Sequence, residues 1–209
     1  VMKNYLLLVA LFSGLLVFGQ KKSATTTADS EKKSLLNTEA LSVFKFRSIG
    51  PALTSGRVAD IAVNPAKPSE YYVAVASGGV WKTSNAGNTW QHVLANEGSY
   101  SMGCVVLDPN NTNVVWVGSG ENNNQRSVAY GDGVYKSTDA GKTWKCVGLE
   151  ATKTIHRIVI NPKNPAQLWV AAMGSVWGGN KERGVYKSED GGSTWKQVLY
   201  VNLTAGCAE

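Results

Sequence analysis

Three acidic residues in two glycine-bounded loops are the side chains of this sequence best suited to hydrolytic chemistry. Glu121 and Asp132 lie in the loop 120–133, and Glu182 lies in the loop 174–184. Cleavage of a glycosidic bond needs two carboxyl groups, one as general acid and one as nucleophile or base. Glu121 with Asp132, and Glu121 with Glu182, are therefore the acid pairs to test. Their separations do not follow from the sequence.

The same loops carry side chains that could hold a ligand. Amides, aromatic rings and paired charges can hydrogen-bond to sugar hydroxyls or to a peptide backbone. We therefore predict a binding surface that contains Arg57, Glu121, Asn122, Asn123, Arg126, Tyr130, Trp177 and Arg183. The alternative is that asparagine and glycine only make a solvated loop, and it applies above all to residues 122–124.

A recurring octapeptide must position these loops. It occupies residues 83–90, 137–144 and 188–195, and each copy ends in Thr-Trp. A period of about 50 residues indicates a repeat architecture. The chain therefore divides into three similar units.

Each unit contains four short β-rich runs separated by glycine, asparagine and proline. A proline follows the first run of every unit and ends that strand, because proline cannot donate to a ladder. The predicted strands are 58–63, 71–76, 80–83 and 89–94 in the first unit, 104–107, 114–118, 134–137 and 143–147 in the second, and 157–160, 168–173, 185–188 and 194–200 in the third.

Four antiparallel strands per repeat predict an all-β fold, a β-propeller built of four-stranded blades. The blades span about residues 44–98, 99–150 and 151–200. Residues 201–209 look like the start of a fourth blade, because Gly206-Cys207 repeats Gly103-Cys104. Since closed propellers have ~4–8 blades, we expect an N-terminal fragment of a larger propeller. The alternative is that open arcs assemble between chains.

The octapeptide lies between the third and fourth strands and has the chemistry of a hairpin turn. Its Asp or Asn can accept hydrogen bonds from turn amides, its glycine can adopt a positive φ, and its tryptophan can cover the turn. We expect this structural role, and not catalysis, for Asn85, Gly87, Trp90, Asp139, Gly141, Trp144, Asp190, Gly192 and Trp195.

These blades resemble the sortilin-like Asp-box (BNR repeat) propellers of secreted bacterial proteins, which are often labelled glycosyl hydrolases. The resemblance covers about residues 44–209 and rests on the boxes with Phe46-Arg47-Ser48-Ile49-Gly50-Pro51, Gly56-Arg57-Val58 and Ser77-Gly78-Gly79-Val80-Trp81-Lys82. It implies an exported module that binds a peptide, a protein or a glycan through the loops at one end face. The alternatives are a glycoside hydrolase acting on an extracellular polysaccharide and a scaffold for a further domain.

Two enzyme families with such propellers can be compared residue by residue. Xyloglucan-active glycoside hydrolases carry a catalytic Asp two residues before the Gly-Gly of their first blade, and Ala76 occupies that position here. Sialidases carry an Arg-Ile-Pro motif, which Arg47 and the residues after it match only loosely. The resemblance therefore favours binding over catalysis.

Asp60, Cys104 and Arg157 share one repeat position, at the start of the first strand of each unit. We expect Asp60 and Arg157 to form an ion pair across the central channel. The alternative is that a carboxylate beside an arginine holds a ligand.

The segments outside the repeats indicate export. Residues 1–19 combine Lys3 with the apolar run 5–18, the pattern of a signal peptide, and the run is shorter than the roughly 20 residues of a membrane span. Residues 20–43 have the composition of a flexible linker. We therefore predict a secreted, periplasmic or cell-surface protein without a stable membrane span.

Charge and cysteine content exclude other classes. The net charge of +6 forms no basic stripe along the repeats, so no nucleic-acid partner is predicted. Cys104, Cys146 and Cys207 lack metal-ligand spacing, and with only two histidines the sequence predicts no metal and no cofactor. One pair of the three cysteines could be oxidised, or a partner cysteine could lie elsewhere.

Overall fold

The computed structural model describes residues 56–123 and 128–209, all within the structural unit Phe46–Glu209. The predicted signal peptide, the predicted linker, Arg47 and Arg126 lie outside the described residues. The described chain folds into three four-stranded antiparallel sheets, and its one helical element is the 3-10 turn η1 at Glu150–Thr152. The predicted all-β class is therefore confirmed.

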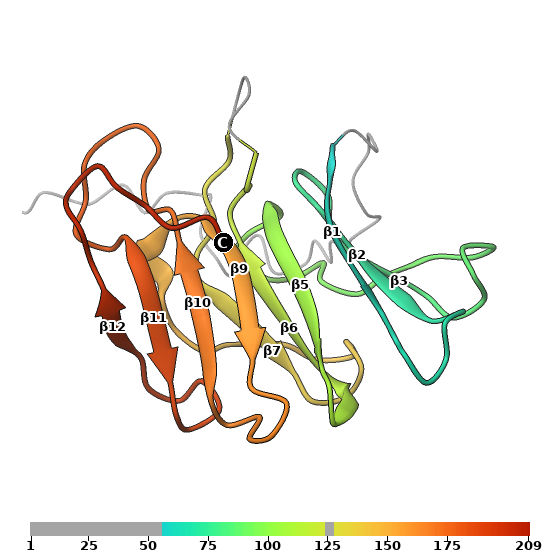
Figure 1. The fold of residues 1–209 in the computed structure, drawn as a ribbon. Helices are drawn as coiled ribbons and strands as arrows, with labels where there is room; N and C mark the ends of the chain where they lie inside the picture. Colours follow the sequence, from blue (N-terminus) through green and yellow to red (C-terminus); the bar gives the residue numbers. More distant parts are fainter. Residues whose placement is uncertain (1–55, 124–127) are drawn as a thin grey trace, which may run out of the picture. The chain divides into compact units, whose positions relative to one another are not determined.

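Each sheet uses four consecutive strands in chain order (Figure 1). Sheet 1 comprises β1 (Val58–Val63), β2 (Tyr71–Val75), β3 (Gly79–Thr83) and β4 (Gln91–His92). Sheet 2 comprises β5 (Met102–Asp108), β6 (Asn111–Ser119), β7 (Val134–Ser137) and β8 (Lys145–Cys146). Sheet 3 comprises β9 (Ile155–Ile160), β10 (Leu168–Ala172), β11 (Gly184–Ser188) and β12 (Lys196–Leu199).

The fourth strands are shorter than the sequence predicts, most clearly β4 and β8. The reason lies in the octapeptide turns, which we call the box turns. The Thr89 amide donates to Asn85 Oδ1 and the Thr143 amide donates to Asp139 Oδ1, both at 2.9 Å. These amides are occupied inside the turn, so the ladder begins only after the following tryptophan.

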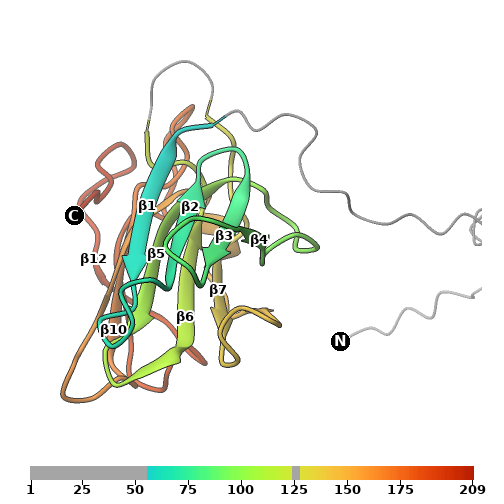
Figure 2. The ribbon, with the colours of Figure 1, turned by 90° about the vertical axis from the view of Figure 1, so that its right-hand side faces the viewer.

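The antiparallel order gives every sheet two different ends. Box turns connect β3 to β4, β7 to β8 and β11 to β12 at one end, which we call the box end. The loops from β2 to β3, from β6 to β7 and from β10 to β11 lie at the other end, which we call the loop end. The segments that enter β1, β5 and β9 also lie at the loop end (Figures 1 and 2).

Two separate hydrophobic cores hold the sheets together. Ala62, Tyr72 and Leu94 of sheet 1 and the segment that follows it cluster with Val115 and Val117 of sheet 2. On the opposite face of sheet 2, Trp116 and Val134 cluster with residues of sheet 3, which include Ile158 and Leu168. Alternate residues of β6 thus face different neighbours, so sheet 2 is buried on both faces. The first strands β1, β5 and β9 lie next to one another in that order.

Candidate ligand-binding loops at one end of the sheets

An ion pair joins sheets 1 and 2 at the loop end. The guanidinium of Arg57, which precedes β1, contacts the carboxylate of Glu121, which follows β6. The Glu121 side chain is 1% exposed, whereas that of Arg57 is 41% exposed. The sequence named both residues as ligand contacts, and the structure brings them together as partners. The exposed part of the pair is the arginine.

The neighbouring asparagines have different surroundings. Asn122 Nδ2 donates to the carbonyl of Gly103 at 2.7 Å and to that of Ala59 at 3.5 Å, so this amide ties the start of β5 to β1. Asn123 is exposed to solvent. Asn122 is therefore occupied by backbone contacts, and Asn123 has an amide that a ligand can reach.

Tyr130 connects the loops of sheets 2 and 3. Its hydroxyl lies 2.9 Å from Ser175 Oγ, in the loop between β10 and β11. Its carbonyl accepts a hydrogen bond of 3.4 Å from Ser99 Oγ, in the segment that enters β5. Three segments that are distant in sequence therefore meet around this tyrosine.

Arg183 organises the loop that presents Trp177. Its guanidinium donates to the carbonyls of Ser175 and Gly178, on either side of Trp177, and to the carbonyl of Met173. The Arg183 residue is 5% exposed and Trp177 is 66% exposed. Trp177, Arg183 and residues near them also line a cavity of about 380 Å³. The arginine predicted to bind a ligand instead holds the loop, and the indole beside it is free to solvent.

The acidic candidates other than Glu121 also have neighbours. Asp132 Oδ2 accepts from the Tyr135 hydroxyl at 2.7 Å, and its Oδ1 accepts from Ser119 Oγ at 3.3 Å. Burial, and then the hydrogen bond to Asp132, raise the pKa of Tyr135. Glu182 is half-buried and, after burial itself, is a second cause of the raised pKa of Tyr186. The hydrogen-bond and ion-pair partners of Asp132 and Glu121 in the described residues are thus Tyr135, Ser119 and Arg57, and not a second acid of either predicted pair.

The expected ion pair between Asp60 and Arg157 is absent from the ion pairs of residues 56–123 and 128–209. Asp60 Oδ2 accepts instead from the amide of Val105 at 3.0 Å, and Oδ1 accepts from the amide of Ile61 at 2.9 Å. The carboxylate thus satisfies a backbone amide of the neighbouring first strand. Cys104 lies at the same repeat position, and its complete burial raises the pKa of its thiol to about 12.

Tyr100 is an exposed aromatic that the sequence reasoning did not select. It precedes β5 at the loop end and is 63% exposed. Its carbonyl accepts from the amide of Gly79 at 2.9 Å, which fixes its backbone against sheet 1. The available signal was its position, four residues before the predicted first strand 104–107 and two residues before the observed β5.

The described part of the chain offers no cluster of metal ligands, no disulfide and no membrane-spanning helix. No group of three or more His, Cys, Asp or Glu side chains there is placed to hold a metal ion. Cys104, Cys146 and Cys207 are free thiols. No described helix has the length and apolar character needed to cross a membrane.

The proteins of known structure or name that this chain resembles include xyloglucanases and other GH74 enzymes. No family model matches the chain. The xyloglucanase Xgh74A of Acetivibrio thermocellus is 25% identical, and the match covers 68% of this chain and 20% of that protein. A xyloglucanase from a Paenibacillus species is 26% identical, with 66% of this chain and 16% of that protein covered. The chain thus spans about a fifth of the length of the curated relatives it matches.

Solved structures give the same result. An ancestral GH74 enzyme superposes with a TM-score of 0.59 and 24% identity, covering 76% of this chain and 20% of that chain. The GH74 xyloglucanase from Xanthomonas campestris superposes with a TM-score of 0.51 and 19% identity, covering 68% of this chain and 23% of that chain. The fold is therefore that of a β-propeller, and the likeness is to glycosyl hydrolase propellers.

Proposed function

We propose that this chain belongs to an exported β-propeller that binds a polysaccharide of the xyloglucan class at its loop end. The observation that carries the proposal is the exposed indole of Trp177 on a loop fixed by the buried Arg183. The relatives named xyloglucanases support a glycan as the ligand rather than a peptide.

The aromatic side chains of the loop end suit a sugar chain. Trp177, Tyr100 and Tyr130 are 66%, 63% and 38% exposed, and they come from three different loops. Aromatic rings offer large apolar faces, and tyrosine adds a polar edge. A pyranose ring has an apolar face and a hydroxyl rim, so it matches rings combined with amides such as that of Asn123.

The same geometry favours binding over hydrolysis by the predicted acids. Glu121 is buried against Arg57, and Asp132 accepts hydrogen bonds from Tyr135 and Ser119. Ala76 has no carboxylate to offer at the position that the resemblance assigns to a catalytic Asp. The alternative ligand is a peptide, captured as the sortilin-like resemblance implies, and it would bind at the same loop end.

The proposal is tested by titrating the chain with soluble xyloglucan and, separately, with an unrelated peptide library. We expect saturable binding to xyloglucan that weakens about tenfold in Trp177→Ala, because loss of a stacked ring removes roughly 1.4 kcal/mol. Trp90→Ala is the matched control, since Trp90 is 44% exposed at the box end. Unchanged affinity in Trp177→Ala would contradict the site, and binding to peptides alone would contradict the ligand class.

Hydrolysis of xyloglucan is a second candidate function, because the relatives are named xyloglucanases. The measurement is release of reducing ends from xyloglucan by the chain, by Glu121→Gln and by Asp132→Asn. Turnover that both variants abolish would assign the acids to catalysis. Binding without turnover is the result that the proposed binding function predicts.

A further inference from the structure

The second residue after the tryptophan of each box turn occupies the same place in all three sheets. These residues are His92, Cys146 and Gln197. Each lies on the fourth strand, opposite an aromatic residue of the third strand, and the aromatic residues are Trp81, Tyr135 and Tyr186. We call this place the strut position, because in sheets 2 and 3 its side chain reaches the loop between the second and third strands.

In sheets 2 and 3 the strut side chain donates a hydrogen bond to a carbonyl of that loop. Cys146 Sγ lies 3.7 Å from the carbonyl oxygen of Asp132, and Gln197 Nε2 donates to the carbonyl of Arg183 at 2.7 Å. Asp132 and Arg183 each precede the first valine of a third strand by two residues, as Gly78 does in sheet 1. The same carbonyl of the repeat therefore accepts the bond in both sheets.

His92 lacks this hydrogen bond in sheet 1. Both of its ring nitrogens are buried and have no hydrogen-bond partner within the described residues. The ring stacks on Trp81, with ring centres 4.7 Å apart, and the Gly78 carbonyl already accepts from Trp81 Nε1 at 2.8 Å. Because buried polar groups are almost always hydrogen-bonded, an orphaned ring needs a physical reason.

The ring of His92 instead supports the short turn between β2 and β3 by packing. Gly79 has the left-handed φ of 67°, and a Cβ added to it would overlap with His92 Nε2. Since a methyl group does not fit between Gly79 and the ring, a water molecule does not fit there either. The Gly79 amide donates to the Tyr100 carbonyl at 2.9 Å, so the supported turn also holds the segment that enters β5.

The surroundings of His92 favour its neutral form. Burial is the largest influence and lowers the pKa of His92, whereas the Glu97 carboxylate and the Gly78 carbonyl act in the opposite direction. Stacking on the Trp81 ring also favours an imidazolium. Burial outweighs these groups, because a charge without a hydrogen-bond acceptor is costly to hold away from water.

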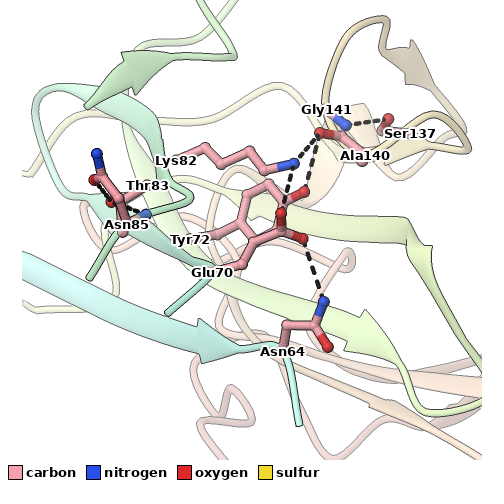
Figure 3. Close-up of polar contacts among 9 residues, drawn as sticks. All are labelled: Asn64, Glu70, Tyr72, Lys82, Thr83, Asn85, Ser137, Ala140 and Gly141. Atoms are coloured by element: carbon pink, nitrogen blue, oxygen red, sulfur yellow. Dashed lines mark hydrogen bonds and ion pairs between the residues drawn. The ribbon is translucent and has the colours of Figure 1, made fainter. Parts of the chain in front are cut away.

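Other charged groups near the ring have partners of their own. Lys82 follows Trp81 on β3 and so lies on the other face of sheet 1, where it donates to the carbonyl of Ala140 at 3.3 Å (Figure 3). Asp132 of sheet 2 packs against Gly98 and accepts from the Tyr135 hydroxyl. Glu97 is therefore the acidic side chain that favours proton binding by His92.

We propose that His92 is a pH-sensitive strut, whose protonation opens the Gly78–Gly79 turn and releases the segment that enters β5. The neutral ring carries one N–H, and protonation adds a second N–H together with a charge. The space around the ring holds no free acceptor in the described residues and no room for water, so the charged ring leaves it and the turn loses its support. Burial raises the pKa of Cys146 and Gln197 does not titrate, so the change is confined to sheet 1.

The direction of the pH effect follows from the lowered pKa of His92. Its value in the closed turn lies below the ordinary value of about 6.5, so the opened turn binds the proton more tightly. The closed turn is therefore fully favoured above about pH 6.5, and opening increases as the pH falls below that value. Carboxyl groups ordinarily titrate near pH 4, so this effect is separate from the acid sensitivity of the box turns.

Amide hydrogen exchange of the full chain tests the proposal at Gly79, because its bond to the Tyr100 carbonyl breaks when the turn opens. The protection factor corrects for the intrinsic effect of pH on exchange. It should fall about tenfold between about pH 7.5 and about pH 5.5, the change that corresponds to one pKa unit. The equivalent amide of sheet 2, that of Gly133, donates to Ser119 Oγ at 3.0 Å and should keep its protection. An equal fall at both glycines would contradict a local opening.

Two histidine variants assign the effect to one ring. His92→Gln should abolish the fall at Gly79, because it supplies the amide found at the strut position of sheet 3 and does not titrate. His156→Gln is the matched control, since His156 is the other histidine of the chain and burial lowers its pKa as well. This control should keep the wild-type fall. A full fall in His92→Gln, or its disappearance in His156→Gln, would overturn the proposal.

The wild-type ring gives a readout that needs no substitution, should His92→Gln fail to fold. Nuclear magnetic resonance follows the His92 ring protons and the Gly79 amide in one pH titration. Both should change with a common midpoint below about pH 6.5. A ring midpoint at or above that pH, or a Gly79 amide that does not follow the ring, would show that His92 is not the strut that opens the turn.

Discussion

The two ends of the sheets differ in how closely the repeats resemble one another. At the box end, the second and third turns make the same contacts, including Trp144 to Val93 and Trp195 to Val147 at equal distances. At the loop end, the loop from β2 to β3 is minimal, whereas the loops 120–133 and 174–183 are long and unlike. Repetition at the box end maintains the stacking of the sheets, and the divergent loops are where the proposed ligand binding would lie.

The largest expected effect is a loss of stability on substitution of a box-end tryptophan. Trp144→Ala should lower the free energy of unfolding by about 3 kcal/mol, since it removes a packed indole and its hydrogen bond to Val93. Trp90→Ala should lower it by about 1 kcal/mol or less, since Trp90 is partly exposed. Urea denaturation of both variants measures the difference. Equal losses of unfolding free energy would show that the second box turn stabilises the fold no more than the first.

The next effect is a difference in stability loss between substitutions of the two partners of the loop-end ion pair. Arg57→Ala should cost about 2 kcal/mol, because it leaves the 1% exposed Glu121 carboxylate without its partner. Glu121→Gln should cost about 1 kcal/mol, because the 41% exposed Arg57 can be solvated. Urea midpoints of the two variants and of the double variant test this order. A larger loss in Glu121→Gln would contradict it.

Acid pH should weaken the box end selectively. The Thr143 hydroxyl and then the Thr143 amide lower the pKa of Asp139 to about 2, and the corresponding groups of Thr194 do the same for Asp190. Because these folded-state pKa values lie below the ordinary value of about 3.9, their stabilisation is present above about pH 4 and is lost as the pH falls toward 2. Thermal melts across that window measure it. In Asp139→Asn the slope of melting temperature against pH should decrease, and an unchanged slope would argue against the turn contacts.

A small effect sharpens the account of the loop end. Tyr130→Phe removes the hydroxyl that lies 2.9 Å from Ser175 Oγ and keeps the ring. We expect a stability loss of about 0.5 kcal/mol, because the contact is exposed, together with faster amide exchange in the loop 174–183. Ser175→Ala should give the same exchange pattern, and different patterns would show that the two loops are not coupled through this contact.

The architecture could be predicted because each unit repeats the same local sequence patterns. Alternation and turn residues located the twelve strands of the described residues, and the proline after each first strand marked its end. The lengths of β4 and β8 were overestimated because the amides of Thr89 and Thr143 are consumed by the turns. The contacts between one unit's tryptophan and the preceding unit's valine were not predicted, since they depend on how sheets stack.

The candidate site was less predictable because its residues act across loops. Residue type suggested that Arg183 binds a ligand, but its guanidinium is occupied by carbonyls that lie beside Trp177. Glu121 and Arg57 were both named, but their pairing required the register of two sheets. The expected contact of Asp60 with Arg157 was wrong because a strand amide, that of Val105, lies closer to the carboxylate.

The division of labour between the two ends is tested most directly by calorimetric titration with a short xyloglucan oligosaccharide, which reports affinity per chain. Wild type and Trp90→Ala should bind with the same dissociation constant, and Trp177→Ala should bind about tenfold more weakly. If Trp90→Ala loses affinity while Trp177→Ala keeps it, recognition lies at the box end and the account is wrong.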